Sequence, residues 1–386
     1  MAAFETKTYP NVLMQIGATQ EEIAERLREV FHTFFEDETE RIYHDGPEDT
    51  GYLVDTGNID ARTEGMSYGM MMCVQLGRKD LFDRIWKWAK TYMYMEEGEN
   101  EGYFAWSCAL DGKKNAYGPA PDGEEFFAMA LFFASHRWGD GEGIYCYSQE
   151  ARAILRACLH KGEKGRPGAA MWNRENAQIL FVPGCPFTDP SYHLPHFYEL
   201  FALWADEEDR PFWKRAAQAS RAYLAKACHP ETGLNPEYGR FDGSPMADPM
   251  PWGGTHGDFY SDAYRTAANI GLDAVWFGED AGQMGAPLRM MKFFGTDLEA
   301  VRCVYTVDGK PLEQPVLHPL GLLAGTAQGA LAVLSDDASS EEDREMARTW
   351  VRWFWNQPLR KGVRRYYDNC LYLFALLALS GNYRIW

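Results

Sequence analysis

The spacing of apolar residues along the chain predicts a protein built almost entirely of helices. Thr19 and Glu22 form the capping-box pattern that begins a helix, and the apolar residues after them recur every three or four positions, at Ile23, Leu27, Val30, Phe31 and Phe34. The same periodicity predicts eleven further helices, at about 64–76, 79–95, 123–138, 148–161, 190–206, 209–228, 261–276, 282–295, 319–334, 341–356 and 366–381.

These twelve helices alternate in character along the chain. The odd-numbered ones carry charge on one face, as in residues 78–88 and 341–350, whereas the even-numbered ones are apolar nearly all round, as in 267–274, 321–330 and 371–379. A helix that is apolar on every side must be buried on every side. The alternation therefore predicts an all-α fold, an (α/α)6 barrel of six helical hairpins with the apolar helices inside.

Turn signals between the helices predict short β-hairpins in the rim loops. Asp111-Gly112 follows the strand-like segment 103–108, and Asp308-Gly309 separates 305–307 from 310–312. In a barrel of hairpins all six inner helices begin at the same end. We therefore expect one rim to collect residues that are far apart in sequence: Glu64, Asp122, Tyr192, Asp262, His318 and the segment 365–368.

Composition narrows the class of protein. The 386 residues are 46% hydrophobic and contain no low-complexity linker, so we expect one domain spanning 1–386. The formal charge of −18 disfavours nucleic acid and anionic membranes as partners and suits a neutral polar ligand. The N-terminal segment has no apolar signal core and no stretch reads as a membrane helix, which favours a cytoplasmic location. No pattern indicates a cofactor, a metal site or an obligate protein partner.

Three carboxyl groups stand at the starts of three inner helices: Glu64, Asp122 and Asp262. Each could simply be a capping or first-turn residue that the helix dipole favours. The dipole lowers the pKa of a carboxyl group, whereas a general acid needs a raised one, so burial or a carboxylate neighbour would have to outweigh it at Glu64. Their joint occurrence on one rim favours acid/base chemistry on a neutral polar substrate.

Aromatic residues crowd the same segments, and their flat faces suit sugar rings, although each could equally be a core residue. They are Phe104, Trp106, Trp172, Tyr192, Trp252, Tyr264, Tyr366 and Tyr367. His193 and His196 have a tempting spacing for a metal, but Pro195 lies between them and no further ligand completes a shell. The aromatic residues therefore favour a carbohydrate over a metal as the ligand.

Glu64 and the residues after it, Glu-Gly-Met-Ser-Tyr-Gly-Met, resemble the general-acid signature of glycoside hydrolase family 8. The resemblance extends over nearly the whole chain and includes residues 118–126, 189–193, 259–265 and 365–369. It implies an (α/α)6 barrel, in agreement with the helix pattern. Within the family the chain is most similar to enzymes that release xylose from the reducing end of xylo-oligosaccharides, with Leu317-His318-Pro319 as the marker; the region 239–258 has no clear counterpart.

The resemblance implies a role for each residue. Glu64 is the general acid, Asp262 is the general base, and Asp122 binds and distorts the reacting sugar while raising the pKa of Glu64. Tyr192 positions the attacking water, Arg265 holds Asp262 or a sugar hydroxyl, and His318 reads the free reducing end. The implied substrate-binding residues are Trp106, Tyr192, Arg265, His318, Tyr366 and Tyr367.

The hypothesis is therefore an inverting exo-oligoxylanase acting on short xylo-oligosaccharides. An endo-acting xylanase, cellulase or chitosanase of the same family remains the nearest alternative. A sugar epimerase on the same scaffold, or a sugar-binding protein without activity, is more remote.

Overall fold

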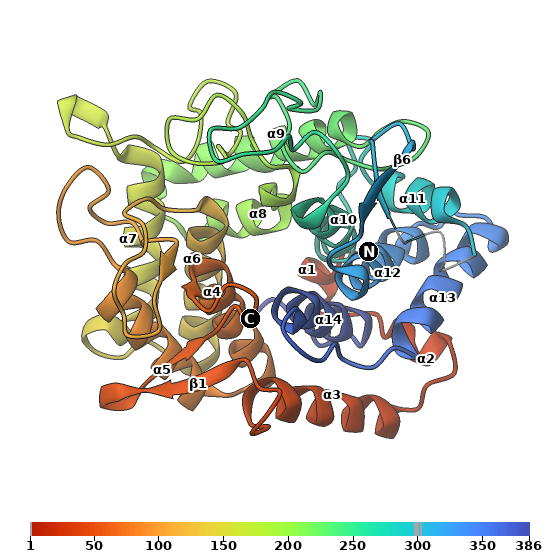
Figure 1. Ribbon diagram of the computed structural model, residues 1–386, viewed down its shortest axis with the longest axis horizontal. Coiled ribbons are helices and arrows are strands. Elements are labelled where there is room, and N and C mark those ends of the chain that lie inside the picture. The colour runs from red at the N-terminus through yellow and green to blue at the C-terminus, as the bar shows by residue number, and fades with distance from the viewer. Residues whose placement is uncertain (1, 297–300, 302) are drawn as a thin grey trace.

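Six helices form a ring at the centre of the computed structural model, which describes residues 2–296, 301 and 303–386 (Figure 1). They are α4 (Thr63–Leu76), α6 (Pro121–Trp138), α8 (Pro195–Trp204), α10 (Tyr264–Trp276), α12 (Pro319–Ser335) and α14 (Arg365–Leu379). Each contacts the next, and α14 contacts α4, so the ring is closed. Small residues allow the close approach: a Cβ atom on Gly325 of α12 would lie 2.1 Å from the carbonyl oxygen of Tyr264 on α10.

A second set of six helices lies outside the ring, each against an inner helix. These are α3 (Gln20–Phe35), α5 (Lys79–Trp88), α7 (Tyr147–His160), α9 (Arg210–Ala227), α11 (Ala286–Phe294) and α13 (Glu341–Trp355). They bury only one face, whereas the inner helices are buried nearly all round, because only the inner ones lack a charged stripe. All twelve predicted helices are therefore confirmed, and their alternation between inner and outer positions is confirmed with them.

Several helix boundaries differ from the predicted ones. Proline starts α8 at Pro195, because Pro190–Tyr192 forms a separate 3-10 turn that Asp189 caps, and a similar turn at Ser261–Ala263 precedes α10. The outer helix α5 gives way to a π-helical turn over Ala89–Met93. The remaining short helices are α1 (Ala3–Thr6), α2 (Val12–Gln15) and the 3-10 turns Pro47–Asp49, Gly143–Tyr145, Glu163–Gly165 and Glu207–Asp209.

Within the described ranges, three short antiparallel strand pairs occupy the loops: β1 (Tyr43–Gly46) with β2 (Thr50–Leu53), β3 (Ala61–Arg62) with β4 (Ser107–Cys108), and β5 (Cys303–Tyr305) with β6 (Pro311–Pro315). The hairpin predicted around Asp308-Gly309 is confirmed as β5 and β6. The hairpin predicted around Asp111-Gly112 is confirmed as well: Cys108 bridges antiparallel to Lys114, and the Ala109 amide donates to the Lys113 carbonyl at 2.8 Å. β4 also pairs with β3, and the Ser107 hydroxyl donates to Asp60 at 2.6 Å.

The starts of the inner helices converge at one end of the ring. Arg265, at the start of α10, contacts Glu64 at the start of α4 and Asp122 at the start of α6, and Tyr366, at the start of α14, donates a hydrogen bond to Glu64. The closed ring therefore places the predicted rim residues side by side. No helix in the described ranges combines the length and apolar character needed to cross a bilayer.

Candidate active site

A single buried guanidinium, that of Arg265, joins the three carboxyl groups predicted on the rim. Its Nη1 lies 3.1 Å from Glu64 Oε2 and 3.1 Å from Asp122 Oδ2 and donates to the Tyr68 hydroxyl at 2.8 Å. Its Nη2 lies 3.3 Å from Asp262 Oδ1. Because Arg265 is only 4% exposed, these contacts form in a largely dry setting where charges interact strongly. Glu64 and Asp262 thus lie on different nitrogens of one planar group.

Local backbone structure fixes the three carboxyl groups. Glu64 is the second residue of α4, directly after β3, and the Thr63 amide donates to the Trp106 carbonyl at 3.0 Å. Asp122 follows the proline that opens α6, and its Oδ1 accepts the Gly123 amide at 2.9 Å. Asp262 lies in the tight turn before α10. Each carboxyl group is therefore held by the start of its own inner helix.

The turn that carries Asp262 is strained. Ser261 has a φ of 43°, a left-handed conformation that is uncommon for a residue with a side chain. The Tyr367 hydroxyl donates to the Ser261 carbonyl at 3.1 Å and so stabilises the turn. Backbone strain of this kind costs free energy and is found preferentially at functional sites.

The electrostatics of the cluster favour a protonated Glu64. Burial raises its pKa, Arg265 opposes the rise, and the charges of Asp122 and Asp262 add to it, so that the pKa lies at about 7. The Tyr366 hydroxyl, which donates to Glu64 Oε1 at 2.9 Å, opposes the rise further. Burial and neighbouring carboxylates thus outweigh the helix dipole.

A fourth carboxyl group, Asp189, adds to this cluster. Its Oδ2 lies 4.0 Å from Arg265 Nη2, and its Oδ1 accepts the Ser191 amide at 2.7 Å. Burial, together with the charge of Asp262, raises the pKa of Asp189 well above its usual value, and burial also raises the pKa of Asp122. Four carboxyl groups around one guanidinium cannot all be ionised at low cost, so the cluster binds protons near neutral pH.

Glu64 and Asp262 both face one pocket of about 190 Å³. A pocket with a carboxyl group of raised pKa and a second carboxyl group in contact with a cation has the components of an acid/base site. Its lining consists of Asp55, Asn58, Arg62, Glu64, Ser261, Asp262, Leu317, His318, Arg364, Tyr366 and Tyr367.

His318 forms a rigid part of the pocket wall. It caps α12, and its Nδ1 lies 3.1 Å from Oδ2 of Asp368, a fully buried carboxylate in the first turn of α14. Asp368 also accepts the Gly321 amide at 2.6 Å and pairs with Arg360. With Nδ1 engaged in this way, the Nε2 atom of His318 is the nitrogen left for a ligand.

Three of the predicted substrate-binding residues, Arg265, Tyr192 and Trp106, lie beside the pocket rather than in its lining. The Tyr192 ring lies 5.6 Å from the Arg265 guanidinium, in cation–π geometry, and is nearly buried. Trp106 is 37% exposed, and Arg62, a pocket residue, stacks on it at 5.2 Å. Trp106 therefore contacts a residue of the pocket lining, Arg62, and its carbonyl accepts the Thr63 amide at 3.0 Å.

Sequence reasoning did not single out several residues of the site. Asp55 accepts the Gly57 amide at 2.8 Å and pairs with Arg62 at 3.2 Å, so it shapes the pocket loop. Arg364 and Asn58 line the pocket as well. Tyr68 lies one helical turn after Glu64, a spacing that could have indicated a shared face. The others depend on contacts between distant segments and leave no local signal.

The loop 239–258 is anchored near Asp262. Glu237 Oε2 lies 2.6 Å from His256 Nδ1, and the Tyr238 ring stacks on His256 at 4.3 Å. Burial raises the pKa of Glu237 to about 6, with His256 opposing and the charge of Asp262 adding. Trp252 projects from this loop with 56% of its surface exposed. His256 of the loop, paired with Glu237, thus lies within electrostatic range of the candidate base Asp262.

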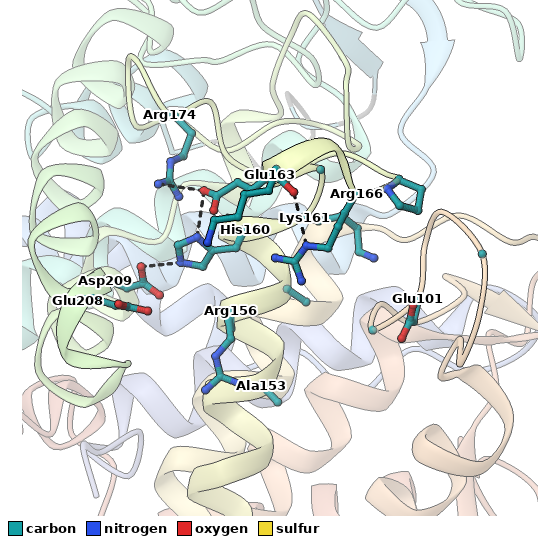
Figure 2. Close-up of a pocket in the computed structure, with 16 residues that line it drawn as sticks. Glu101, Ala153, Arg156, His160, Lys161, Glu163, Arg166, Arg174, Glu208 and Asp209 are labelled. Carbon is teal, nitrogen blue, oxygen red and sulfur yellow. Dashed lines mark hydrogen bonds and ion pairs between the residues drawn. The ribbon is translucent and has the colours of Figure 1, made fainter.

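A larger pocket, of about 620 Å³, lies away from this cluster, where α7 ends and α9 begins (Figure 2). Figure 2 shows His160 between Glu163 and Asp209, at 3.0 and 2.8 Å, and Arg174 also paired with Glu163. Its charged groups largely neutralise one another. The chemistry therefore points to the smaller pocket at Glu64.

His193 and His196 do not form a metal pair. His193 is bonded through both ring nitrogens, to the Thr188 and Ser220 hydroxyls, whereas His196 lies in the core of the ring. Burial lowers the pKa of both to about 3, so both are neutral. Across residues 2–296, 301 and 303–386, no three His, Cys, Asp or Glu side chains are grouped so as to hold a metal ion.

Comparison with known proteins identifies relatives that cover the whole chain. The family model described as glycosyl hydrolases family 8 matches residues 1–380. A curated protein of Halalkalibacterium halodurans, named reducing end xylose-releasing exo-oligoxylanase, is 55% identical over 100% of this chain and 96% of its own. A crystal structure of such an enzyme matches with a TM-score of 0.94 at 58% identity, covering 100% of this chain and 98% of that one. A mutant of such an enzyme, complexed with xylobiose, matches with a TM-score of 0.94 at 54% identity and covers 100% of both chains.

Proposed function

Because this chain belongs to glycoside hydrolase family 8, we propose that it is an inverting glycoside hydrolase that releases xylose from the reducing end of short xylo-oligosaccharides. We also propose that residues 1–386 form one catalytic domain folded as an (α/α)6 barrel. The closed ring of inner helices, the outer helix against each, and a hydrophobic core that runs from Ala3 to Tyr383 support this architecture.

The single observation that carries the proposal is the placement of Glu64 and Asp262 on different nitrogens of Arg265, facing one pocket. An inverting glycosidase needs an acid on the leaving-group side of the sugar and a base on the opposite side, roughly 6.5–9.5 Å apart, so that water fits beside the base. A planar guanidinium with one carboxyl group on each terminal nitrogen suits such a spacing.

In the proposed reaction, Glu64 gives its proton to the glycosidic oxygen as the bond to the anomeric carbon breaks. Asp262 takes a proton from the water that attacks that carbon from the opposite face. Xylose leaves with the proton of Glu64, and the remaining fragment carries the hydroxyl from water. The step leaves Glu64 ionised and Asp262 protonated, and proton exchange with solvent restores the starting state before the next turnover. The pKa of about 7 supports the acid role, because Glu64 remains substantially protonated near neutral pH.

The other residues act on binding and orientation. Asp122 contacts the same Arg265 nitrogen as Glu64 and is proposed to bind the reacting sugar while its charge raises the pKa of Glu64. Tyr192, packed against Arg265, is proposed to position the water. Tyr366 and Tyr367 line the pocket, and Trp106 extends its edge through Arg62.

His318 is the residue proposed to select the reducing end. It stands in the pocket wall and is held by Asp368, so its free nitrogen has a fixed position against the leaving sugar. A wall at this place favours removal of one sugar over cleavage inside a polymer. The endo-acting alternative would require the chain to continue past His318. The cytoplasmic location stays a prediction.

Xylotriose labelled with ¹³C in its reducing-end xylose tests the proposal. We expect labelled xylose and unlabelled xylobiose as the first products. Nuclear magnetic resonance at early times should show the new reducing end of xylobiose as the α-anomer, because inversion converts the β-linkage. Labelled xylobiose would contradict release from the reducing end, a β-anomer would contradict inversion, and an unchanged substrate would contradict the activity.

A further inference from the structure

A second cavity lies on the axis of the ring, on the inner side of Arg265. Its volume is about 30 Å³, and every one of the six inner helices or the turn before it contributes to its wall. Arg265 and Asp122 form the end nearest the candidate active site, and Tyr383, from the C-terminal tail, reaches it as well. One water molecule needs roughly 10–15 Å³ in this measure, so the cavity has room for one or two.

Three polar groups of the residues that line this cavity are buried without a protein partner. Ser191 Oγ, His196 Nδ1 and Arg265 Nε have no hydrogen bond to any group in the described ranges. Tyr383 lines the same cavity, and burial is the sole influence on the pKa of its hydroxyl. Each of these four residues is at least nine-tenths buried. Buried polar groups nearly always find a partner, because an unpartnered one costs free energy.

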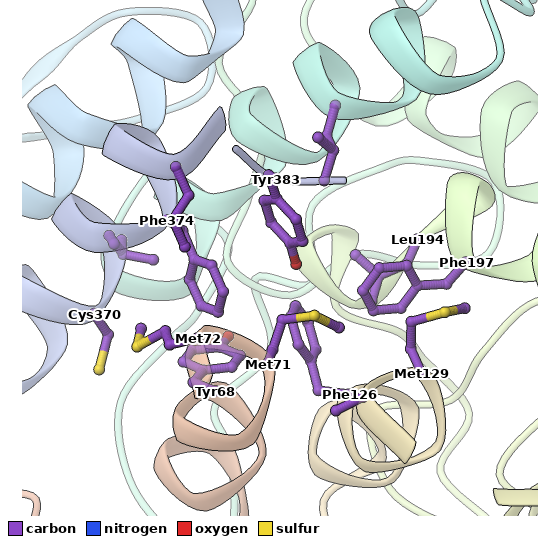
Figure 3. Close-up of a cluster of buried hydrophobic side chains, with 14 of the residues drawn as sticks. Tyr68, Met71, Met72, Phe126, Met129, Leu194, Phe197, Cys370, Phe374 and Tyr383 are labelled. Carbon is purple, nitrogen blue, oxygen red and sulfur yellow. The ribbon is translucent and has the colours of Figure 1, made fainter. Parts of the chain in front are cut away.

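The apolar packing leaves this space open toward the middle of the ring. Figure 3 shows Tyr68, Phe126 and Phe374 around the centre, with Tyr383 pointing its hydroxyl between them. A phenol directed into an aromatic cluster needs an acceptor or donor at its tip. Packing alone therefore does not account for the polar atoms on the wall.

The chemistry of the wall identifies the ligand. Arg265 Nε–H is a pure donor, the Ser191 and Tyr383 hydroxyls donate and accept, and neutral His196 offers one donor and one acceptor. The Arg265 charge repels a cation, and the nearby Asp122 carboxylate disfavours an anion. A small neutral molecule that both donates and accepts meets all four groups, and that molecule is water.

We propose that this cavity is a built water site in which one or two ordered waters bridge Arg265 Nε to Ser191, His196 and Tyr383. The waters hold the guanidinium in the orientation that carries Glu64, Asp122 and Asp262, and Ser191 and His196 are thus positioning residues. The water site does not depend on the proposed function; only its effect on catalysis rests on it.

A high-resolution crystal structure of the unmodified protein tests the water directly. We expect spherical density within hydrogen-bond distance of Arg265 Nε and at least two of the other three groups. A crystal pressurised with xenon provides the opposite test, because dry apolar cavities take up xenon and wet polar ones do not. Xenon in this cavity, or no density for water, would overturn the proposal.

The direction of the change in Tm on removing one cavity hydroxyl tests the water site in solution. Tyr383→Phe removes one hydroxyl from the cavity. If that hydroxyl bonds to water, the change should lower Tm by about 1–3 °C; if it is unpartnered, removing it should leave Tm unchanged or raise it, which would contradict the proposal. Tyr103→Phe is the matched control, because the buried Tyr103 hydroxyl donates to the Ala157 and Ala169 carbonyls at 3.1 and 2.9 Å and should lower Tm in either case.

The positioning role has its own readout. In Ser191→Ala the water loses a partner and Arg265 is held less firmly near Glu64. Because Arg265 opposes the rise of the Glu64 pKa, the high-pH limb of kcat/KM should move to higher pH, and kcat should fall roughly threefold to tenfold with little change in KM. In the control Ser220→Ala, which removes a hydroxyl bonded to His193 at 2.9 Å, the pH profile should not move. An unmoved profile in Ser191→Ala would refute the positioning role and leave the Tm and density tests to decide the water site.

Discussion

The hydrogen bond from Tyr366 to Glu64 lowers the pKa of the proposed acid, and removing the Tyr366 hydroxyl tests that effect. Tyr366→Phe removes the hydroxyl that donates to Glu64 Oε1 at 2.9 Å and leaves the ring in place. A donor to a carboxylate stabilises the ionised form and so lowers its pKa. Without that donor the pKa of Glu64 should rise above about 7. A general acid works while protonated, so activity should persist to higher pH.

The size of the shift follows from the strength of the bond. A hydrogen bond to a charged group contributes about 1.5–3 kcal/mol, and one pKa unit corresponds to about 1.36 kcal/mol. The hydroxyl can also accept a hydrogen bond from protonated Glu64, which offsets part of this effect. We therefore expect the high-pH limb to move upward by about 0.5–1 pH unit.

The assay is kcat/KM on xylotriose as a function of pH, which reports the ionisation of the free enzyme. Tyr372→Phe is the matched control, since Tyr372 lies on the same helix but its hydroxyl bonds to Gln357 and Arg26 away from the pocket. The control limb should not move. A downward or absent shift in Tyr366→Phe, with the protein folded and the control unchanged, would refute Glu64 as the group that sets this limb.

Four further changes test other parts of the reasoning. Glu64→Gln should lower kcat at least 10²-fold while calorimetry still detects binding of xylotriose; substantial residual hydrolysis would remove Glu64 from the acid role. Asp122→Asn removes a charge that raises the pKa of Glu64, so the high-pH limb should move downward, opposite to Tyr366→Phe, and an upward shift would contradict the cluster electrostatics. His318→Ala should raise KM and let labelled xylobiose appear among the products from labelled xylotetraose; an unchanged product pattern would show that His318 does not form the exo wall. Burial raises the pKa of Glu124 to about 8 in the folded protein. A carboxyl group whose pKa is raised on folding contributes its full stability below its unfolded pKa and loses that contribution as the pH rises toward its folded pKa. Glu124→Gln should therefore flatten the fall in Tm between about pH 5 and 8, and an equally steep fall would contradict the buried, protonated state.

Much of the fold could be predicted because the spacing of apolar and charged residues along each helix indicates which of its faces are buried. Segments such as 321–330 and 371–379 have no charged stripe, and the structure places them in the ring. That pattern also predicted which helix starts share a rim. The predicted starts of α8 and α10 were less accurate. Each helix begins only after a separate 3-10 turn: α8 starts at Pro195, after the turn Pro190–Tyr192, and the turn before α10 contains the strained Ser261.

The site was only partly predictable, since its contacts join distant segments. Arg265 was expected to hold Asp262 or a sugar hydroxyl; the structure places it against Asp262 and also against Glu64, Asp122 and Tyr68. Those contacts span as many as 201 residues of sequence, so no local pattern records them. The roles assigned to these residues stay predictions until the variants are measured.

The charge balance around Arg265 explains why Glu64 can serve as the acid. If all four carboxyl groups were ionised, one cation would face four anions in a buried space, which is unfavourable. Fully buried Asp189, whose pKa burial raises well above its usual value, favours the protonated form. Asp122 and Asp189 each accept a backbone amide, which can only donate and so opposes this rise.

Glu64 differs from Asp122 in its partner. Its Oε1 contacts the Tyr366 hydroxyl, which can accept as well as donate and therefore tolerates a protonated carboxyl group. Among the described residues that line the pocket, Glu64 is the carboxyl group with a raised pKa, so it is the one that holds a proton there. A helix start by itself would favour an ionised Glu64; the ring makes it an acid by bringing Asp122 and Asp262 beside it and supplying a partner that accepts either state.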